Sequence, residues 1–203
     1  MTKCIETMME EHELIVQVLA SLQAMARQLE TGAQVPRQDV ADFAQFFRQF
    51  ADKCHHGKEE DQLFRTMVEF GFPQQSGPIA VMLSEHDAGR DEVRSLVEIG
   101  AGSGPMGPPE RARILGAASQ FVPLLFSHIQ KENNILYPMA QQAIPPSALQ
   151  ELDRSCAAFD REVLGQAEVR RLKTLAADLV SRYPASPREL AGYSVCGACT
   201  SAA

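Results

Sequence analysis

The chain has 203 residues, of which 45% are hydrophobic and 22% charged, as expected for one soluble globular domain of about 100–150 residues with an extension. The net charge of -7 argues against a general nucleic-acid-binding surface or an anionic-membrane surface. The sequence contains no long apolar run and no apolar signal core near its start, so it predicts neither a membrane span nor secretion. Its five irregularly spaced cysteines form a poor disulfide framework, and these features together predict a cytoplasmic protein.

Glycine and proline divide most of the chain into four long stretches that show no strand-like alternation. The breaks fall at residues 31–36, 71–78, 100–109 and 144–146. Each stretch is long enough for a helix of about 40 Å, and short connections favour antiparallel neighbours. The sequence therefore predicts an all-α fold, an up-down-up-down four-helix bundle over residues 1–142.

Polar residues occupy the centres of the predicted buried helix faces. Apolar residues spaced by three and four surround His12 in the first stretch, His86 in the third, and His128 with Glu132 in the fourth. In the second stretch an apolar stripe that starts at Phe43 leads into His55. A buried His or Glu without a partner costs several kcal/mol, so a partner is expected.

An internal repeat relates the two halves of the predicted bundle. Glu11-His12-Glu13 recurs 74 residues later as Glu85-His86-Asp87, and the pattern around His55 and Glu59 recurs 73 residues later around His128 and Glu132. Such a duplication would place two similar half-sites face to face.

The repeated polar residues have the chemistry of a metal site. A His and a Glu four residues apart lie on one helix face, so each pair can present an imidazole and a carboxylate to one point. Imidazole and carboxylate ligands suit iron or manganese better than structural zinc. The predicted metal ligands are His12, His55, Glu59, His86, His128 and Glu132.

Five residues near these ligands have two interpretations each. His56 and Glu60 have the same spacing as His55 and Glu59; the repeat favours the latter pair, which leaves His56 and Glu60 facing solvent or a neighbouring helix. Glu11 and Glu85 are either solvated or orient the imidazoles. Tyr137 is interpreted first as a packing residue, with contact to the metal as the alternative.

The remainder of the chain predicts a helical extension over residues 147–183, with a break at Gly165, followed by a mobile tail over residues 184–203. The tail contains Cys196 and Cys199 in a CxxC pattern. A single CxxC is interpreted as part of a reduced tail, with a redox dithiol as the alternative.

The sequence resembles the hemerythrin-like (HHE cation-binding) family over about residues 5–142. The resemblance lies in His12, in His55-His56-Gly57-Lys58-Glu59-Glu60, in Glu85-His86-Asp87 and in His128-x-x-Lys131-Glu132-Asn133 with Leu136-Tyr137-Pro138. It implies a centre of two non-haem iron ions with a bridging oxo or hydroxo group. The set of four His and two Glu is closer to bacterial members than to oxygen-carrying hemerythrins, which use five His with a Glu and an Asp.

The resemblance implies binding or sensing of dioxygen or nitric oxide, with a small diatomic ligand or oxidant as the expected partner and a redox partner as a further one. An enzyme or stress protein is the alternative, acting in peroxide or nitric oxide reduction or in iron-sulfur cluster repair by iron donation. A metal-stabilised scaffold whose C-terminal helices carry the function is the third reading. The sequence leaves open whether the chain is an enzyme.

Overall fold

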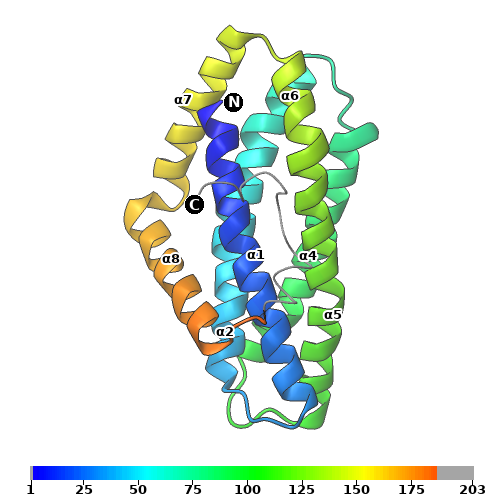
Figure 1. The fold of residues 1–203 in the computed structure, drawn as a ribbon, viewed down its shortest axis with the longest axis vertical. Coiled ribbons are helices and arrows are strands. Elements are labelled where there is room, and N and C mark those ends of the chain that lie inside the picture. Colours follow the sequence, from blue (N-terminus) through cyan, green and yellow to red (C-terminus); the bar gives the residue numbers. More distant parts are fainter. Residues whose placement is uncertain (1, 187–203) are drawn as a thin grey trace, which may run out of the picture.

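The computed structural model describes residues 2–186, and every regular element among them is a helix. Four long helical columns run antiparallel to one another (Figure 1). This arrangement confirms the predicted up-down-up-down bundle. The columns are α1 (Lys3–Glu30); α2 (Arg37–Phe46) with η1 (Phe47–His56), η2 (Glu59–Phe64) and α3 (Arg65–Glu69); α4 (Gly77–Gly100); and α5 (Pro108–Lys131) with η3 (Glu132–Leu136) and α6 (Tyr137–Ala143).

Local signals in the sequence start and end these columns. The Thr2 hydroxyl accepts a hydrogen bond from the backbone N–H of Ile5 at 3.4 Å and caps α1. The Glu110 carboxylate accepts one from the backbone N–H of Gly107 at 2.9 Å at the start of α5. Gly32 follows α1 with a φ of 87°, a conformation that side chains disfavour.

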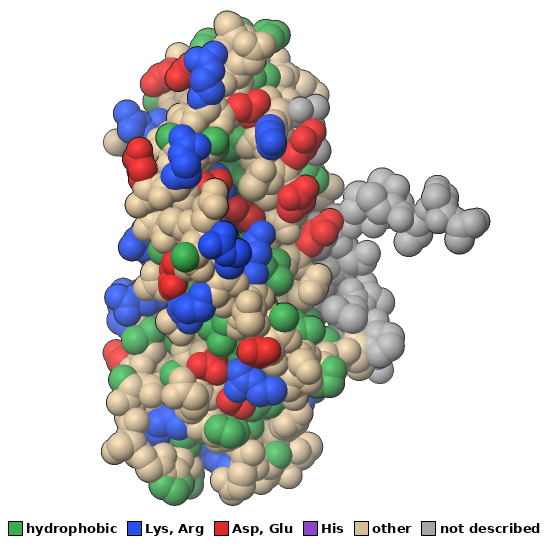
Figure 2. Space-filling view, turned by 90° about the vertical axis from the view of Figure 1, so that its left-hand side faces the viewer, with side chains coloured by type: hydrophobic (Ala, Val, Ile, Leu, Met, Phe, Trp, Pro, Cys, Tyr) green, Lys and Arg blue, Asp and Glu red, His purple; other side chains and the backbone are tan. Residues whose placement is uncertain are grey.

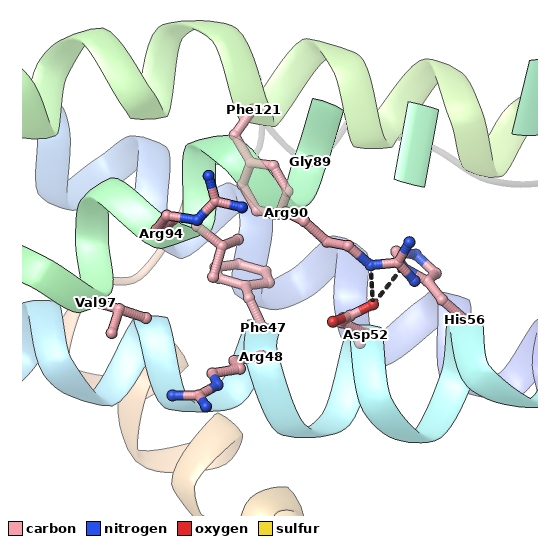
Figure 3. Close-up of a pocket in the computed structure, with 11 residues that line it drawn as sticks. Phe47, Arg48, Asp52, His56, Gly89, Arg90, Arg94, Val97 and Phe121 are labelled. Carbon is pink, nitrogen blue, oxygen red and sulfur yellow. Dashed lines mark hydrogen bonds and ion pairs between the residues drawn. The ribbon is translucent and has the colours of Figure 1, made fainter. Parts of the chain in front are cut away.

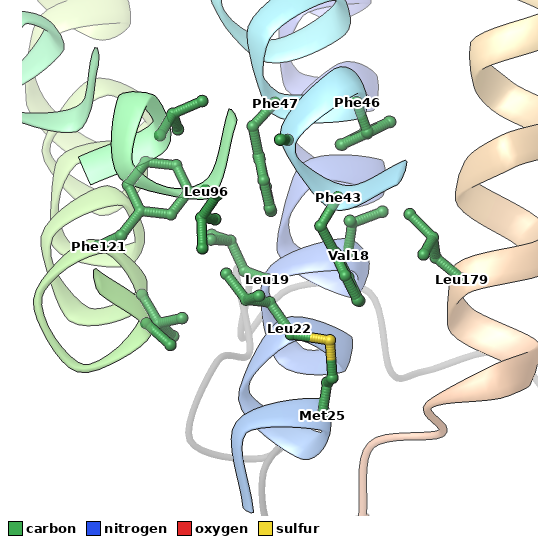
Figure 4. Close-up of a cluster of buried hydrophobic side chains, with 14 of the residues drawn as sticks. Val18, Leu19, Leu22, Met25, Phe43, Phe46, Phe47, Leu96, Phe121 and Leu179 are labelled. Carbon is green, nitrogen blue, oxygen red and sulfur yellow. The ribbon is translucent and has the colours of Figure 1, made fainter. Parts of the chain in front are cut away.

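The bundle interior contains two apolar clusters separated by a polar layer. One cluster includes Leu19, Leu22, Phe47, Leu96 and Phe121, which point toward one another in Figure 4. The other lies toward the start of α1 and includes Met8, Leu63, Met67, Ile79 and Leu136. Since His12 falls between Met8 of one cluster and Ile15 of the other, the predicted metal ligands lie in the layer between two dry cores.

The second and fourth columns change from α-helical to π-helical turns at this polar layer. The π-helical segments η1, η2 and η3 contain His55, His56, Glu59 and Glu132. A π-helix has i→i+5 hydrogen bonds and hence a wider turn, so consecutive side chains diverge less than in an α-helix. Two adjacent residues of η1 can therefore both point into the bundle.

Two further helices, α7 (Pro146–Val163) and α8 (Gly165–Arg182), pack along α1 and the second column (Figure 1). Gly165 has a φ of 70° and separates them, which confirms the predicted break. Leu152 joins one apolar cluster, and Leu172 and Leu179 join the other. Figure 2, which views the molecule from the side of α7 and α8, shows acidic and basic side chains interspersed there. The division of the chain into domains stays a prediction.

The cysteines depart from the prediction. Cys4 and Cys156 form a disulfide that joins the start of α1 to α7, with 5.9 Å between the Cα atoms. The prediction that the cysteines form no disulfide framework is wrong for this pair, because 152 residues separate the two and only the packing of α7 brings them together. Cys54 is buried with a free thiol, and burial raises its pKa to about 12.

Two other expectations concern the membrane and the tail. No helix within residues 2–186 has the length and the apolar composition required to cross a membrane. The predicted mobile tail, with Cys196 and Cys199, falls almost entirely outside the described residues.

Candidate metal centre

Seven buried polar side chains meet in the layer between the two apolar clusters. They come from all four columns, and each is at most 5% exposed. They comprise the six predicted residues and one more: His12, His55, His56, Glu59, His86, His128 and Glu132.

The seven side chains divide into two groups of four that share Glu59. His56, Glu59, His86 and His128 form one group, and His12, His55, Glu59 and Glu132 form the other. Within each group the potential ligand atoms lie within 4.8 Å of one another. One shared carboxylate between two sets of imidazoles is a suitable arrangement for two neighbouring cations.

Imidazole Nε2 atoms of both groups lie near carboxylate oxygens, and those of His86 and His128 also lie 3.0 Å from each other. Glu132 Oε2 lies 3.2 Å from His12 Nε2, and Glu132 Oε1 lies 3.1 Å from His128 Nε2. Glu59 Oε2 lies 3.5 Å from His86 Nε2 and 3.8 Å from His55 Nε2. The second carboxylate, Glu132, thus also reaches toward both groups.

The hydrogen bonding of these atoms shows that a cation fits. Four fully buried atoms, His55 Nε2, Glu59 Oε2 and both carboxylate oxygens of Glu132, have no well-oriented hydrogen bond. Leaving a buried carboxylate oxygen in this state is costly. A cation between the imidazole nitrogens and the carboxylates would satisfy all four atoms, and the donor set of imidazoles and carboxylates suits iron.

Four of the five imidazoles are held from outside the centre by a hydrogen bond at Nδ1, which leaves Nε2 directed inward. Such acceptors fix the tautomer and orientation of ligating imidazoles. The pairs are His12 with Asn133 at 2.8 Å, His55 with Glu11 at 2.8 Å, His86 with Glu60 at 2.7 Å, and His128 with Glu85 at 3.0 Å. Nδ1 of His56 lies 3.7 Å from Asp52, which is beyond hydrogen-bond distance.

His56 is the residue that the sequence left outside the ligand set. It stacks on His86, with 3.9 Å between the ring centroids, and belongs to the group of His86 and His128. The spacing argument assumed an α-helix, in which His55 and His56 diverge, whereas the π-helical turns direct both inward. Glu60 faces the neighbouring helix α4, which is one of the two predicted alternatives. Its carboxylate accepts a hydrogen bond from Nδ1 of His86.

Glu11 and Glu85 orient imidazoles, but not those next to them in the sequence. Glu11 accepts hydrogen bonds from His55 and, at 2.7 Å, from Lys58. Glu85 stands in the same relation to His128 and Lys131. The sequence repeat is thus a structural repeat of a Lys–Glu–His chain.

The two copies differ in their surroundings. Lys58 is fully buried, and Asp160 of α7 contacts its ammonium group at 2.7 Å. Lys131 has a side chain that is 34% exposed. Helix α7 therefore supplies a charged partner, Asp160, to the Lys–Glu–His chain of one of the two half-sites.

Tyr137 is buried and also reaches the centre, where it contacts Glu59; its contact with a metal stays a prediction. Its hydroxyl donates a hydrogen bond to Glu59 Oε1 at 2.5 Å, and its ring stacks on His12. Burial, followed by the charges of Glu59 and Glu132, raises the pKa of the phenol well above its ordinary value. Tyr137 therefore remains protonated and fixes the shared carboxylate.

The electrostatics of the centre favour cation binding. Burial lowers the pKa of His55 well below its ordinary value, and burial together with the neighbouring His86 lowers that of His56 to about 3. Burial also lowers the pKa of His128, but the attraction of Glu132 and the hydrogen bonds to Glu132 and Glu85 outweigh it and raise the pKa to about 10. Two imidazoles are thus neutral donors, and the proton on His128 must leave when a cation binds.

The two adjacent histidines of η1 give a direct test of the two groups. We expect His55→Ala and His56→Ala each to lower the metal content by about one ion per chain, because each removes one imidazole from a different group of four. Metal analysis of the purified variants measures this, with the exposed Lys53→Ala as the matched control. A His56→Ala protein that retains the full metal content would contradict a role for His56 in the centre.

Comparisons with known proteins agree with this geometry. The hemerythrin HHE cation-binding domain matches residues 4–140. The iron-sulfur cluster repair protein YtfE of Yersinia pseudotuberculosis serotype IB is 33% identical over 91 residues, which cover 42% of this chain and 40% of that protein. Proteins of the same name from Salmonella paratyphi B and Salmonella newport are 32% identical over 90 residues, with the same coverage.

The match spans about two fifths of the length of these curated relatives. No solved structure matches the chain. The family match extends over well more than half of the chain and includes all seven residues of the centre. The chain belongs to the hemerythrin HHE cation-binding domain family.

Proposed function

We propose that the chain is a non-haem di-iron protein that binds or senses dioxygen or nitric oxide. The observation that carries the proposal is the pair of four-residue groups that share Glu59, with four buried atoms lacking a hydrogen bond. Each group supplies four protein donors. Iron accepts more ligands than four, so room for a small ligand remains at each position.

The residues of this chain prepare the centre for such a ligand. Hydrogen bonds at Nδ1 hold four of the imidazoles in place, and Tyr137 donates a hydrogen bond to Glu59, so the ligand set needs little rearrangement when a cation binds. The two apolar clusters exclude water from above and below. Bound iron would supply the redox chemistry and the affinity for diatomic molecules.

The reaction of the reduced protein with dioxygen tests the proposal. We expect the di-ferrous protein to react with dioxygen within seconds and then to lose its reduced state, because four protein donors in each group leave coordination positions at which iron would meet dioxygen directly. Stopped-flow absorbance after anaerobic reduction measures this reaction. A protein that shows no spectral change with dioxygen or nitric oxide would contradict the proposal.

A di-iron enzyme or stress protein is the second candidate, and the names of the matched relatives favour it. Iron-sulfur cluster repair by iron donation would require the centre to release iron to an apo-protein acceptor. Transfer of labelled iron to an apo-ferredoxin, or turnover of peroxide or nitric oxide at many equivalents per centre, would support this candidate over simple binding. The chain matches only 40% of the length of the Yersinia relative, so the activity of such relatives is a proposal for this chain.

A further inference from the structure

A pocket of about 380 Å³ lies beside the centre, between η1 and α4 (Figure 3). Its size falls within the range of small-molecule sites. His56 forms its inner end, so the pocket borders the metal centre directly. From there it extends outward along both helices to Arg48 and Val97.

The middle of the pocket is apolar. Phe47 and Phe121 pack edge to face, with 4.9 Å between the ring centroids, and Val93 lies beside them. Gly89 packs against the Phe121 ring, where a Cβ would approach Phe121 Cε2 to 3.3 Å, so a larger residue would narrow the pocket. These surfaces suit an aromatic or branched aliphatic body.

The charges differ between the two ends. At the inner end Arg90 is fully engaged by carboxylates: Asp52 at 2.8 Å, Glu60 at 2.7 Å and Asp87 at 2.9 Å. This end offers no free positive charge, and an anion would meet three carboxylates there. The anionic group of a ligand should therefore lie elsewhere.

The outer end carries two available guanidinium groups. Arg48 is exposed and forms no ion pair with the residues that the structure describes. Arg94 contacts Asp91 at 2.9 Å, but both side chains are about two thirds exposed, so this pair contributes little. Figure 3 shows Arg48 and Arg94 on the side of the pocket away from His56. Guanidinium groups bind carboxylates through paired hydrogen bonds.

We propose that this pocket binds small organic monocarboxylates that have an aromatic or branched aliphatic body. The carboxylate lies between Arg48 and Arg94, and the body fills the space over Phe47 and Phe121 toward His56. Such a ligand would lie against His56, an imidazole of the metal centre. Its binding and the state of the metal centre would therefore influence each other. The site does not depend on which metal the centre holds.

Titration of the iron-loaded protein with 3-phenylpropionate tests the proposal by calorimetry and by the absorbance of the centre. We expect saturable binding at one site and a small spectral shift, since the bound ring contacts the wall formed by His56. The uncharged 3-phenylpropanamide should bind about tenfold more weakly, because a charge-assisted hydrogen bond is lost.

Variants locate the binding. Arg48→Gln should weaken 3-phenylpropionate about tenfold, and Val97→Phe should remove binding by filling the outer half of the pocket. Arg154→Gln, a change at an exposed arginine of α7, is the control and should bind as the parent does. Melting curves check that Val97→Phe is folded, and Arg48→Gln alters only an exposed side chain. Absence of saturable binding, equal binding of the amide, or equal weakening in Arg48→Gln and Arg154→Gln would overturn the proposal.

Discussion

Replacing Glu59 with alanine is expected to remove both metal ions from the chain. Glu59 is the one residue present in both groups of four, and it is fully buried, so no solvent-exposed carboxylate can take its place. Since the binding free energy of the metal is also folding free energy, the variant should lose the stabilisation that the loaded protein gains, about 2.7 kcal/mol per site at a metal concentration 100 times the Kd.

Metal analysis and melting curves with and without added iron measure both effects. Asp61→Ala is the matched control, because Asp61 lies in the same helical segment but is exposed. The control should retain its metal and its stabilisation by iron. A Glu59→Ala protein that still binds two ions would show that the shared carboxylate is not a ligand.

Replacing Lys58 with methionine is expected to destabilise the protein strongly, whereas the same change at Lys131 should not. Lys58 is fully buried between Glu11 and Asp160, and burial lowers its pKa less than the two carboxylates raise it. Its removal leaves two carboxylates facing each other, which costs about 3–5 kcal/mol. Lys131 is partly exposed, and its pair with Glu85 should contribute about 0–1 kcal/mol.

Urea denaturation of both variants gives the comparison, and the internal repeat supplies the matched control. The double variant Lys58→Met with Asp160→Asn should be less destabilised than the sum of its parts, because it removes one of the unpaired charges along with the lysine. Equal destabilisation by Lys58→Met and Lys131→Met would contradict the view that α7 completes one half-site.

Much of the fold could be predicted from particular residues. Glycine and proline at the turns separated four helices, and the apolar residues around His12, His86 and His128 defined the inward faces of three of them. The polar residues on those faces were conspicuous because a lone buried imidazole is unfavourable. The repeat of His55 and Glu59 at His128 and Glu132 then indicated two half-sites. These are local patterns, and local periodicity is visible in a sequence.

The roles of His56 and Glu60 could not be read from spacing. An α-helical period separates His55 from His56 by about 100°, and only the π-helical turns bring both inward. Glu60 approaches His86, 26 residues away, and Asn133 approaches His12, 121 residues away. Glu11 likewise serves His55 rather than its neighbour His12. These contacts depend on how the columns are rotated against one another.

The sequence by itself determined the bundle and the six inward-facing polar residues that it predicts as ligands, because helical periodicity and residue type carry that information. Only the tertiary structure decided that a fifth imidazole joins them, that Cys4 pairs with Cys156, and that Asp160 completes the buried chain from Lys58 to His55. Each of these depends on the path of α7 or on a change in helical pitch. Those features arise from packing between distant segments, which leaves no periodic mark in the sequence.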